Sequence, residues 1–309
     1  MTASATPCTS RRPVRLTLYL PIAEGIVDGS IPRWEEVLAL ARHAESVGFD
    51  GVALGEHFFA RFGEHPVGAW DCWSWLAGLA ATTERVTLTA LVTCTNYRNP
   101  ALIAKMAETV DAMSGGRFVL GVGAGWLQDE FDAFGFPFDH RVDRFAEAIH
   151  IIHGLLRTGR VDFTGQYYQV CELELRPRGP RPSGPPILVG TTGPRMLRLA
   201  ARYADVWDTN FRPADELPAL QATLDAACAE EDRAPATIAR SASVTLSLAG
   251  ESNSFGMPAQ LSGTPDEVAA SLRAYATAGF SDVVVSLTPC TPEGIDEFLP
   301  VLDLLDHEP

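Results

Sequence analysis

Short apolar segments typical of buried strands alternate with helical segments along almost the whole chain. The strand-like segments lie at residues 14–20, 51–54, 86–92, 117–122, 187–189, 205–207, 242–248 and 282–287. These segments are short and mostly apolar, which is typical of parallel strands buried on both faces. A helical segment follows each strand, so eight βα units fit within 309 residues. This number favours an α/β fold of the (β/α)8 TIM-barrel type, with an open doubly wound sheet as the alternative.

The predicted helices carry clear boundary signals. Gly48 ends the first helix, Asn99 caps the helix that begins at Pro100, and Thr264 and Glu267 form a capping box. We expect one barrel domain over residues 14–309, with an insertion between the fourth helix and the fifth strand at about 158–186 that contains a hairpin-like run. Residues 1–13 are rich in Ser, Thr and Pro and predict a disordered tail.

Composition excludes several classes of partner. A net charge of −15 argues against nucleic acid and disfavours an anionic membrane surface. No segment reaches the roughly 18 apolar residues of a transmembrane helix, and the N-terminus lacks the apolar core of a signal peptide. The six cysteines form no C-x-x-C pair, so buried thiols of a cytoplasmic enzyme are favoured over disulfides. We expect no metal site, because His140, His150 and His153 lack metal-ligand spacing.

In a TIM barrel, the chemistry lies at the carboxyl ends of the strands. The sequence after the second strand is Gly55-Glu56-His57-Phe58-Phe59. His57 is a candidate general acid or base, because imidazole titrates near neutral pH. The alternative is a histidine that only hydrogen-bonds within its loop. Glu56 is a second catalytic candidate, either orienting His57 or bonding a cofactor.

The fifth strand leads into a small-residue turn, which is Gly190-Thr191-Thr192-Gly193. A helix then opens at Pro194 and Arg195, and proline suits the first helical position. The amino end of a helix carries partial positive charge and free amide groups. The sequence therefore predicts an anion site at this turn, most often used for phosphate.

Two further strand ends offer space for a ligand. After the third strand, small hydroxyl residues beginning at Thr93 leave room for a flat ring, and Arg98 either meets an acidic ligand or forms a surface salt bridge. After the fourth strand, residues 121–126 read GVGAGW, which lacks the third glycine of a dinucleotide-binding fingerprint. Its glycines allow close backbone approach. Trp126 either walls an aromatic ring or is a core side chain at the barrel rim.

Aromatic side chains near these ends suggest an apolar or aromatic small-molecule substrate. The candidates for substrate contact are Phe59, Trp70 and Trp207. The alternative for the tryptophan cluster of Trp70, Trp73 and Trp75 is packing in the core.

Five segments together resemble the bacterial luciferase-like family. They are residues 48–57 (GFDGVALGEH), 97–101 (YRNPA), 111–126 (DAMSGGRFVLGVGAGW), 190–205 (GTTGPRMLRLAARYAD) and 263–268 (GTPDEV). The resemblance covers residues 14 to about 290. It implies a barrel that binds FMN or the deazaflavin coenzyme F420 at its C-terminal face, with His57 near the reactive ring. It also implies a non-proline cis peptide bond near 91–93 and a homodimer. The cofactor-binding residues it implies are Val92, Thr93, Gly123, Ala124, Gly125, Trp126, Gly190, Thr191, Thr192, Gly193 and Arg195.

Within this resemblance, the residues favour F420 over FMN. Luciferases place an arginine in the strand-four loop to meet the FMN phosphate, and the matching position here is Ala124. The GAGW and GTTGPR segments look more like the deazaflavin-using branch. The sugar-phosphate dehydrogenases of that branch carry a tryptophan four residues after the histidine and a glutamate in the strand-four loop. This chain has Arg61 and Ala124 there, so we do not expect that activity.

The resemblance therefore implies an oxidoreductase that transfers hydride between F420 and an organic substrate, with His57 giving or taking the proton. A 5-deazaflavin has carbon where flavin has N5, so it moves hydride and largely ignores oxygen. One alternative is an FMN-dependent monooxygenase that uses oxygen and a separate flavin reductase. Another is a barrel that only sequesters a flavin.

Overall fold

The structure is a computed structural model that describes residues 12–25, 29–62, 65–253 and 257–307. Eight parallel strands within these ranges close into a barrel. They pair in chain order, β13 pairs with β1, and the pairing of β10 with β7 completes the ring. The predicted TIM barrel is confirmed, and the open sheet is excluded. The barrel strands are β1 (Arg15–Tyr19), β2 (Gly51–Leu54), β5 (Thr87–Ala90), β7 (Phe118–Gly123), β10 (Ile187–Gly190), β11 (Val206–Asp208), β12 (Ala239–Leu246) and β13 (Asp282–Leu287).

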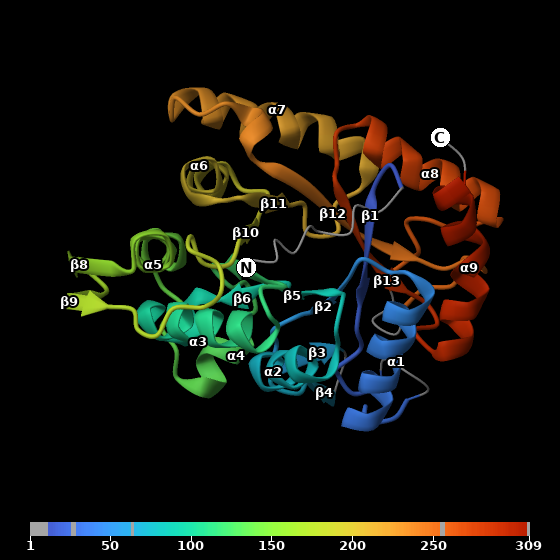
Figure 1. Cartoon of the computed structure of the whole chain (residues 1–309), viewed down its shortest axis with the longest axis horizontal. Helices are drawn as coiled ribbons and strands as arrows, with labels where there is room; N and C mark the ends of the chain where they lie inside the picture. The colour runs from blue at the N-terminus through green and yellow to red at the C-terminus, as the bar shows by residue number, and fades with distance from the viewer. Residues whose placement is uncertain (1–11, 26–28, 63–64, 254–256, 308–309) are drawn as a thin grey trace, which may run out of the picture.

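Helices surround this barrel on the outside (Figure 1). The predicted boundary signals are in place: Gly48 ends the first helix with φ at 105°, the Asn99 side chain accepts a hydrogen bond from the Ala101 amide, and Thr264 forms the capping box. The long helices are α1 (Trp34–Val47), α2 (Cys72–Thr82), α3 (Pro100–Met113), α5 (Arg141–Thr158), α6 (Pro194–Tyr203), α7 (Leu217–Glu230), α8 (Pro265–Thr277) and α9 (Pro292–His307).

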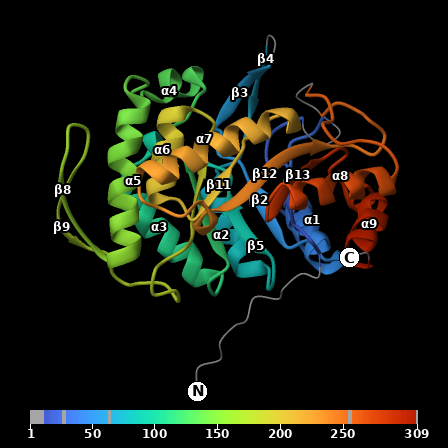
Figure 2. The ribbon, with the colours of Figure 1, turned by 90° about the horizontal axis from the view of Figure 1, so that it is seen from above.

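Several shorter elements were not predicted. A hairpin of β3 (Phe59–Phe62) and β4 (His65–Gly68) follows β2, and α4 (Gln128–Phe134) follows β7. Figure 2 shows this hairpin and α4 at one end of the barrel. The third predicted strand forms β5, and a separate short strand, β6 (Thr93–Cys94), follows the predicted range. Three short 3-10 turns, η1 (Thr95–Tyr97), η2 (Ala214–Glu216) and η3 (Pro235–Thr237), complete the elements of the described residues.

The hairpin-like run expected in the insertion is present. It forms β8 (Arg160–Thr164) and β9 (Gln169–Glu174), which project beyond α5 in both ribbon views (Figures 1 and 2). The loop after the hairpin is tied to α3, because Arg178 pairs with the buried Glu108 and Arg181 pairs with the buried Asp111. Residues 1–11 of the predicted tail lie outside the described residues, whereas Arg12 pairs with Asp306 of α9.

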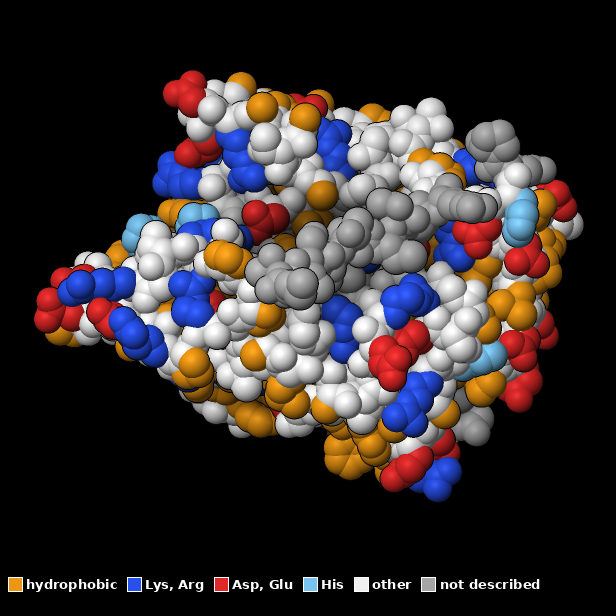
Figure 3. All heavy atoms as spheres, viewed as in Figure 1, with side chains coloured by type: hydrophobic (Ala, Val, Ile, Leu, Met, Phe, Trp, Pro, Cys, Tyr) orange, Lys and Arg blue, Asp and Glu red, His pale blue; other side chains and the backbone are white. Residues whose placement is uncertain are grey.

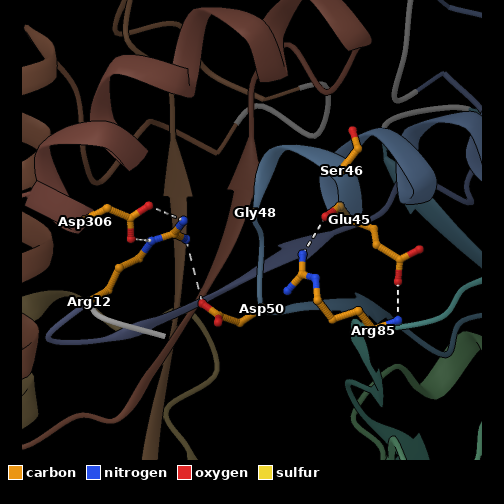
Figure 4. Close-up of a pocket in the computed structure, with 7 residues that line it drawn as sticks. All are labelled: Arg12, Glu45, Ser46, Gly48, Asp50, Arg85 and Asp306. Atoms are coloured by element: carbon orange, nitrogen blue, oxygen red, sulfur yellow. Dashed lines mark hydrogen bonds and ion pairs between the residues drawn. The ribbon is translucent and has the colours of Figure 1, made fainter. Parts of the chain in front are cut away.

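A small pocket lies at the amino ends of the strands, opposite the end where the chemistry of a barrel is found (Figure 4). Its lining includes Arg12 and Arg85, and both guanidinium groups are engaged by the protein itself. Arg12 pairs with Asp306, and Arg85 donates to the carbonyl oxygens of Glu45 and Phe49. These bonds join α1, α9 and the start of β5, so we assign the pocket a role in stability.

Cysteines, charge and helix length add three observations. Cys72, Cys94, Cys228 and Cys290 are free and buried as expected, whereas Cys171 is exposed on β9; Cys8 lies outside the described residues. On the face of the molecule shown in Figure 3, acidic and basic side chains are interspersed. Within the described ranges, no helix is long and apolar enough to cross a membrane, and no group of His, Cys, Asp and Glu side chains is arranged to hold a metal.

Candidate active site

His57 lies just beyond the carboxyl end of β2, beside a buried glutamate from another element. Its Nδ1 is 3.0 Å from Oε2 of Glu130, which belongs to α4. Glu130 is fully buried, whereas the His57 side chain is 35% exposed. The indole ring of Trp126 packs edge-on against the imidazole, with ring centroids 5.6 Å apart. His57 thus combines a fixed side and an accessible side, as a proton-transfer group requires.

The carboxylate of Glu130 is surrounded by donors. Tyr97 donates its hydroxyl to Oε2 over 2.9 Å, and the backbone amides of Phe58 and Phe59 donate to Oε1. Burial opposes ionisation, but the bonds from His57, Phe58 and Tyr97 outweigh it, so the pKa of Glu130 lies below its usual value. Glu130 was missed by the sequence analysis. It stands 73 residues from His57 in the chain, and only the unpredicted helix α4 brings the two together.

Glu56 points to a different set of partners. Its Oε1 is 2.6 Å from the Arg98 guanidinium, and its Oε2 accepts the amide of Cys94 over 2.8 Å. Burial raises the pKa of Glu56 to about 7, although Arg98 and the Cys94 amide oppose that rise. No hydrogen bond joins Glu56 to His57 among the described residues. Arg98 also pairs with Asp71, so it belongs to an internal ion-pair network in this structure.

The side chain of Val92 lies against the ends of β7 and β10. The peptide bond between Leu91 and Val92 is cis, as the family resemblance implied. A Cβ added to Gly123 would lie 2.9 Å from Val92 Cγ2, and one added to Gly190 would lie 2.9 Å from Val92 Cγ1. Both glycines are therefore needed to make room for the valine side chain. The missing side chains at both positions also allow a ligand to approach the backbone closely.

The loop after β7 is held by residues from the end of the third strand. Asn96 donates to the carbonyl oxygen of Ala124 over 2.9 Å. Gly125 has φ at 74°, and a Cβ there would lie 2.6 Å from Cys94 Sγ. Trp126 is 66% exposed, which excludes the alternative of a core side chain. The hydroxyl of Thr93 is buried without a hydrogen-bond partner among the described residues.

The predicted anion loop has the expected strand, turn and helix. β10 ends at Gly190, Thr191 is buried, and α6 begins at Pro194 with Gly193 as its N-cap. Gly193 is exposed, and a Cβ added to it would meet no atom within 4 Å. The first-turn amides of the helix have no partners within the helix. The Arg195 side chain is 63% exposed and pairs with Asp143 of α5 at 2.5 Å.

The three substrate candidates occupy different environments. Phe59 stacks on Phe134, with ring centroids 6.5 Å apart. Trp70 is 46% exposed, donates to the Pro32 carbonyl oxygen and stacks on Trp75, so it does not pack in the core. The prediction for Trp207 was wrong. Its side chain is fully buried and donates its indole N–H to the Thr191 carbonyl oxygen, so it supports the anion loop and forms no surface for a substrate.

A phosphate-bearing cofactor fits the residues at this end of the barrel. The open space beside the Cα of Gly193 and the backbone amides at the start of α6 suit a phosphate. No arginine occupies the loop after β7, where Ala124 stands. The buried hydroxyl of Thr93 and the accessible face of His57 lie at neighbouring strand ends, so a ring held between these loops would meet polar groups as well as Trp126.

Parallel strands that close into a barrel surrounded by helices define the TIM-barrel class of α/β proteins. The chain belongs to one family of that class, the luciferase-like monooxygenases, whose sequence profile matches residues 14–254. The resemblance stated above is therefore confirmed.

Three relatives illustrate the breadth of this family. The chain is 35% identical over 189 residues to an F420-dependent glucose-6-phosphate dehydrogenase of Nakamurella multipartita, covering 59% of this chain and 54% of the relative. It is 34% identical over 184 residues to the pyrimidine monooxygenase RutA of Cronobacter sakazakii, covering 57% and 53%. The chain thus spans about half the length of these curated relatives. A solved F420-dependent secondary alcohol dehydrogenase, in complex with an F420-acetone adduct, superposes with a TM-score of 0.79 at 19% identity, covering 94% and 99%. This last likeness concerns the fold.

Proposed function

We propose that this protein is an F420-dependent oxidoreductase that transfers hydride between the deazaflavin and an organic substrate. The observation that carries the proposal is the pairing of an open helix N-terminus at Gly193 with a half-exposed histidine at another strand end. The F420-dependent relatives among the matched proteins support it. When bound, the deazaflavin supplies hydride chemistry at its ring carbon.

The residues of this chain have separate tasks in the proposed reaction. The turn from Gly190 to Gly193 and the start of α6 bind the cofactor phosphate, and Thr93 and Ala124 border the ring. His57 holds or moves the proton that accompanies hydride transfer. Trp126 and Phe134 are 66% and 52% exposed, which supports an apolar or aromatic small-molecule substrate.

We do not propose the sugar-phosphate activity of the first relative. This chain has Ala124 and Arg61 at the positions that the sugar-phosphate branch fills with Glu and Trp. A cytoplasmic location and a homodimer remain predictions of the composition and the resemblance.

The alternative is an FMN-dependent monooxygenase, which the 34% sequence identity to the pyrimidine monooxygenase RutA supports. Fluorescence titration of the purified protein with each cofactor separates the two. We expect micromolar binding of F420 and weaker binding of FMN. Micromolar binding of FMN with no binding of F420 would contradict the proposal.

A further inference from the structure

The imidazole of His57 has two nitrogens, and among the residues that the structure describes only one of them bonds to the protein interior. Nδ1 lies 3.0 Å from Oε2 of Glu130, a carboxylate with no exposed surface. Nε2, on the other side of the ring, belongs to a side chain that is 35% exposed. The chemical state of Glu130 therefore decides which nitrogen carries the proton of the neutral imidazole.

Three groups donate to Glu130, which favours the ionised carboxylate as the acceptor. The amides of Phe58 and Phe59 can only donate, and both point at Oε1. Tyr97 donates its hydroxyl to Oε2, which also faces His57. A proton shared between a carboxylate and an imidazole resides on the imidazole, because it is the stronger base by about two pKa units. Nδ1 is consequently a donor, and the lone pair of the neutral ring is on Nε2.

We propose that Glu130 is a positioning residue that holds His57 as its Nδ1–H tautomer and leaves Nε2 as the atom that exchanges a proton with the substrate. This inference rests on the proposed function for its catalytic consequence, but not for the tautomer itself. In the direction of alcohol oxidation, the O–H bond breaks and its proton bonds to Nε2. The C–H bond of the carbon that bears this oxygen breaks as its hydrogen leaves as hydride for the cofactor. The product is a carbonyl compound.

The substitution Glu130→Gln should invert the tautomer of His57. The amides of Phe58 and Phe59 can only be satisfied by the carbonyl oxygen of glutamine, so that oxygen must take the Oε1 position. The NH2 group then occupies the Oε2 position and donates toward His57. Nδ1 becomes an acceptor, and the ring proton moves to Nε2. The variant keeps the shape of the site and inverts the tautomer.

Nitrogen-15 NMR of histidine-labelled protein, recorded without cofactor or substrate in alkaline buffer, tests the tautomer directly. The chain has seven histidines, so the His57→Gln spectrum identifies the signal. We expect a protonated Nδ1 in the wild type, a protonated Nε2 in Glu130→Gln, and a protonated Nδ1 in the matched control Tyr97→Phe. A protonated Nε2 in the wild type would overturn the inference, whether or not Glu130→Gln folds.

Turnover with F420 adds the catalytic consequence. We expect Glu130→Gln to lower kcat about 10²- to 10⁴-fold, as when the carboxylate partner of a catalytic histidine becomes an amide. Cofactor affinity should change less than threefold, and Tyr97→Phe should lose less than about tenfold in kcat. An inverted tautomer with unchanged kcat would overturn the assignment of Nε2. If no F420 turnover occurs in the wild type while the tautomer inverts, the proposed function fails and the tautomer assignment stands.

Discussion

The indole N–H of Trp207 donates a hydrogen bond to the carbonyl oxygen of Thr191 over 2.8 Å, so a buried side chain on β11 fixes the loop that follows β10. The substitution Trp207→Phe keeps most of the apolar volume and removes this bond. A lost neutral hydrogen bond costs about 1 kcal/mol. We expect the dissociation constant for F420 to rise about 3- to 10-fold. Titration followed by F420 fluorescence measures it, and an unchanged constant would show that the loop is held by other contacts.

A substitution at Gly193 should weaken cofactor binding without changing the stability of the fold. Its φ of −77° suits any residue, and an added Cβ meets no protein atom within 4 Å. We therefore expect Gly193→Ala to change the free energy of unfolding by less than about 0.5 kcal/mol. The added methyl group occupies the space assigned to the phosphate, so F420 affinity should fall about tenfold. Urea denaturation and titration check the two effects; full affinity in the alanine variant would place the phosphate elsewhere.

Val92 and Gly123 should be energetically coupled. A Cβ at position 123 lies 2.9 Å from Val92 Cγ2, so Gly123→Ala forces a clash that we expect to cost about 1–3 kcal/mol of stability. Val92→Ala removes the clashing atoms. The double variant should therefore be more stable than the sum of the single effects by at least about 1 kcal/mol. Additive effects in a double-mutant cycle by urea denaturation are the contrary outcome.

Asp208 should make stability depend on pH. Burial raises the pKa of its carboxyl to about 6, although the Asn210 amide and the Ser243 hydroxyl oppose this rise. The unfolded chain has an ordinary Asp pKa of about 3.9, so the folded state binds the proton more tightly. The stabilisation is complete below pH about 4 and is lost as pH rises through about 6.

The variant Asp208→Asn isolates this contribution. It removes the titrating group, so the difference in unfolding free energy between wild type and variant should fall with rising pH, by on the order of 2 kcal/mol in total. Urea denaturation between pH 4 and 8 measures the difference. A difference that is constant with pH, or that grows with pH, would refute the assignment.

The strands and the main site loops were predictable because the buried parallel strands and the helix caps leave local signals. His57 and the Gly190–Gly193 turn were identified in this way. Glu130 was not, since α4 is a short amphipathic segment whose packing depends on contacts with Phe58 and Tyr97 far away in the chain. The error at Trp207 has a similar origin: its position at a strand end was predicted, but the direction of its side chain depends on how the strands close into a barrel.

Oxygen dependence tests the central claim most directly. The measurement is substrate conversion under strictly anaerobic conditions, with F420 or its reduced form and a panel of alcohols, carbonyl compounds, imines and activated alkenes, followed by the absorbance of the oxidised deazaflavin. We predict conversion that matches cofactor turnover one to one, continues without oxygen, and is lost in His57→Ala although F420 still binds. Conversion that requires oxygen and reduced FMN, with none supported by F420, would contradict hydride transfer as the function of this barrel.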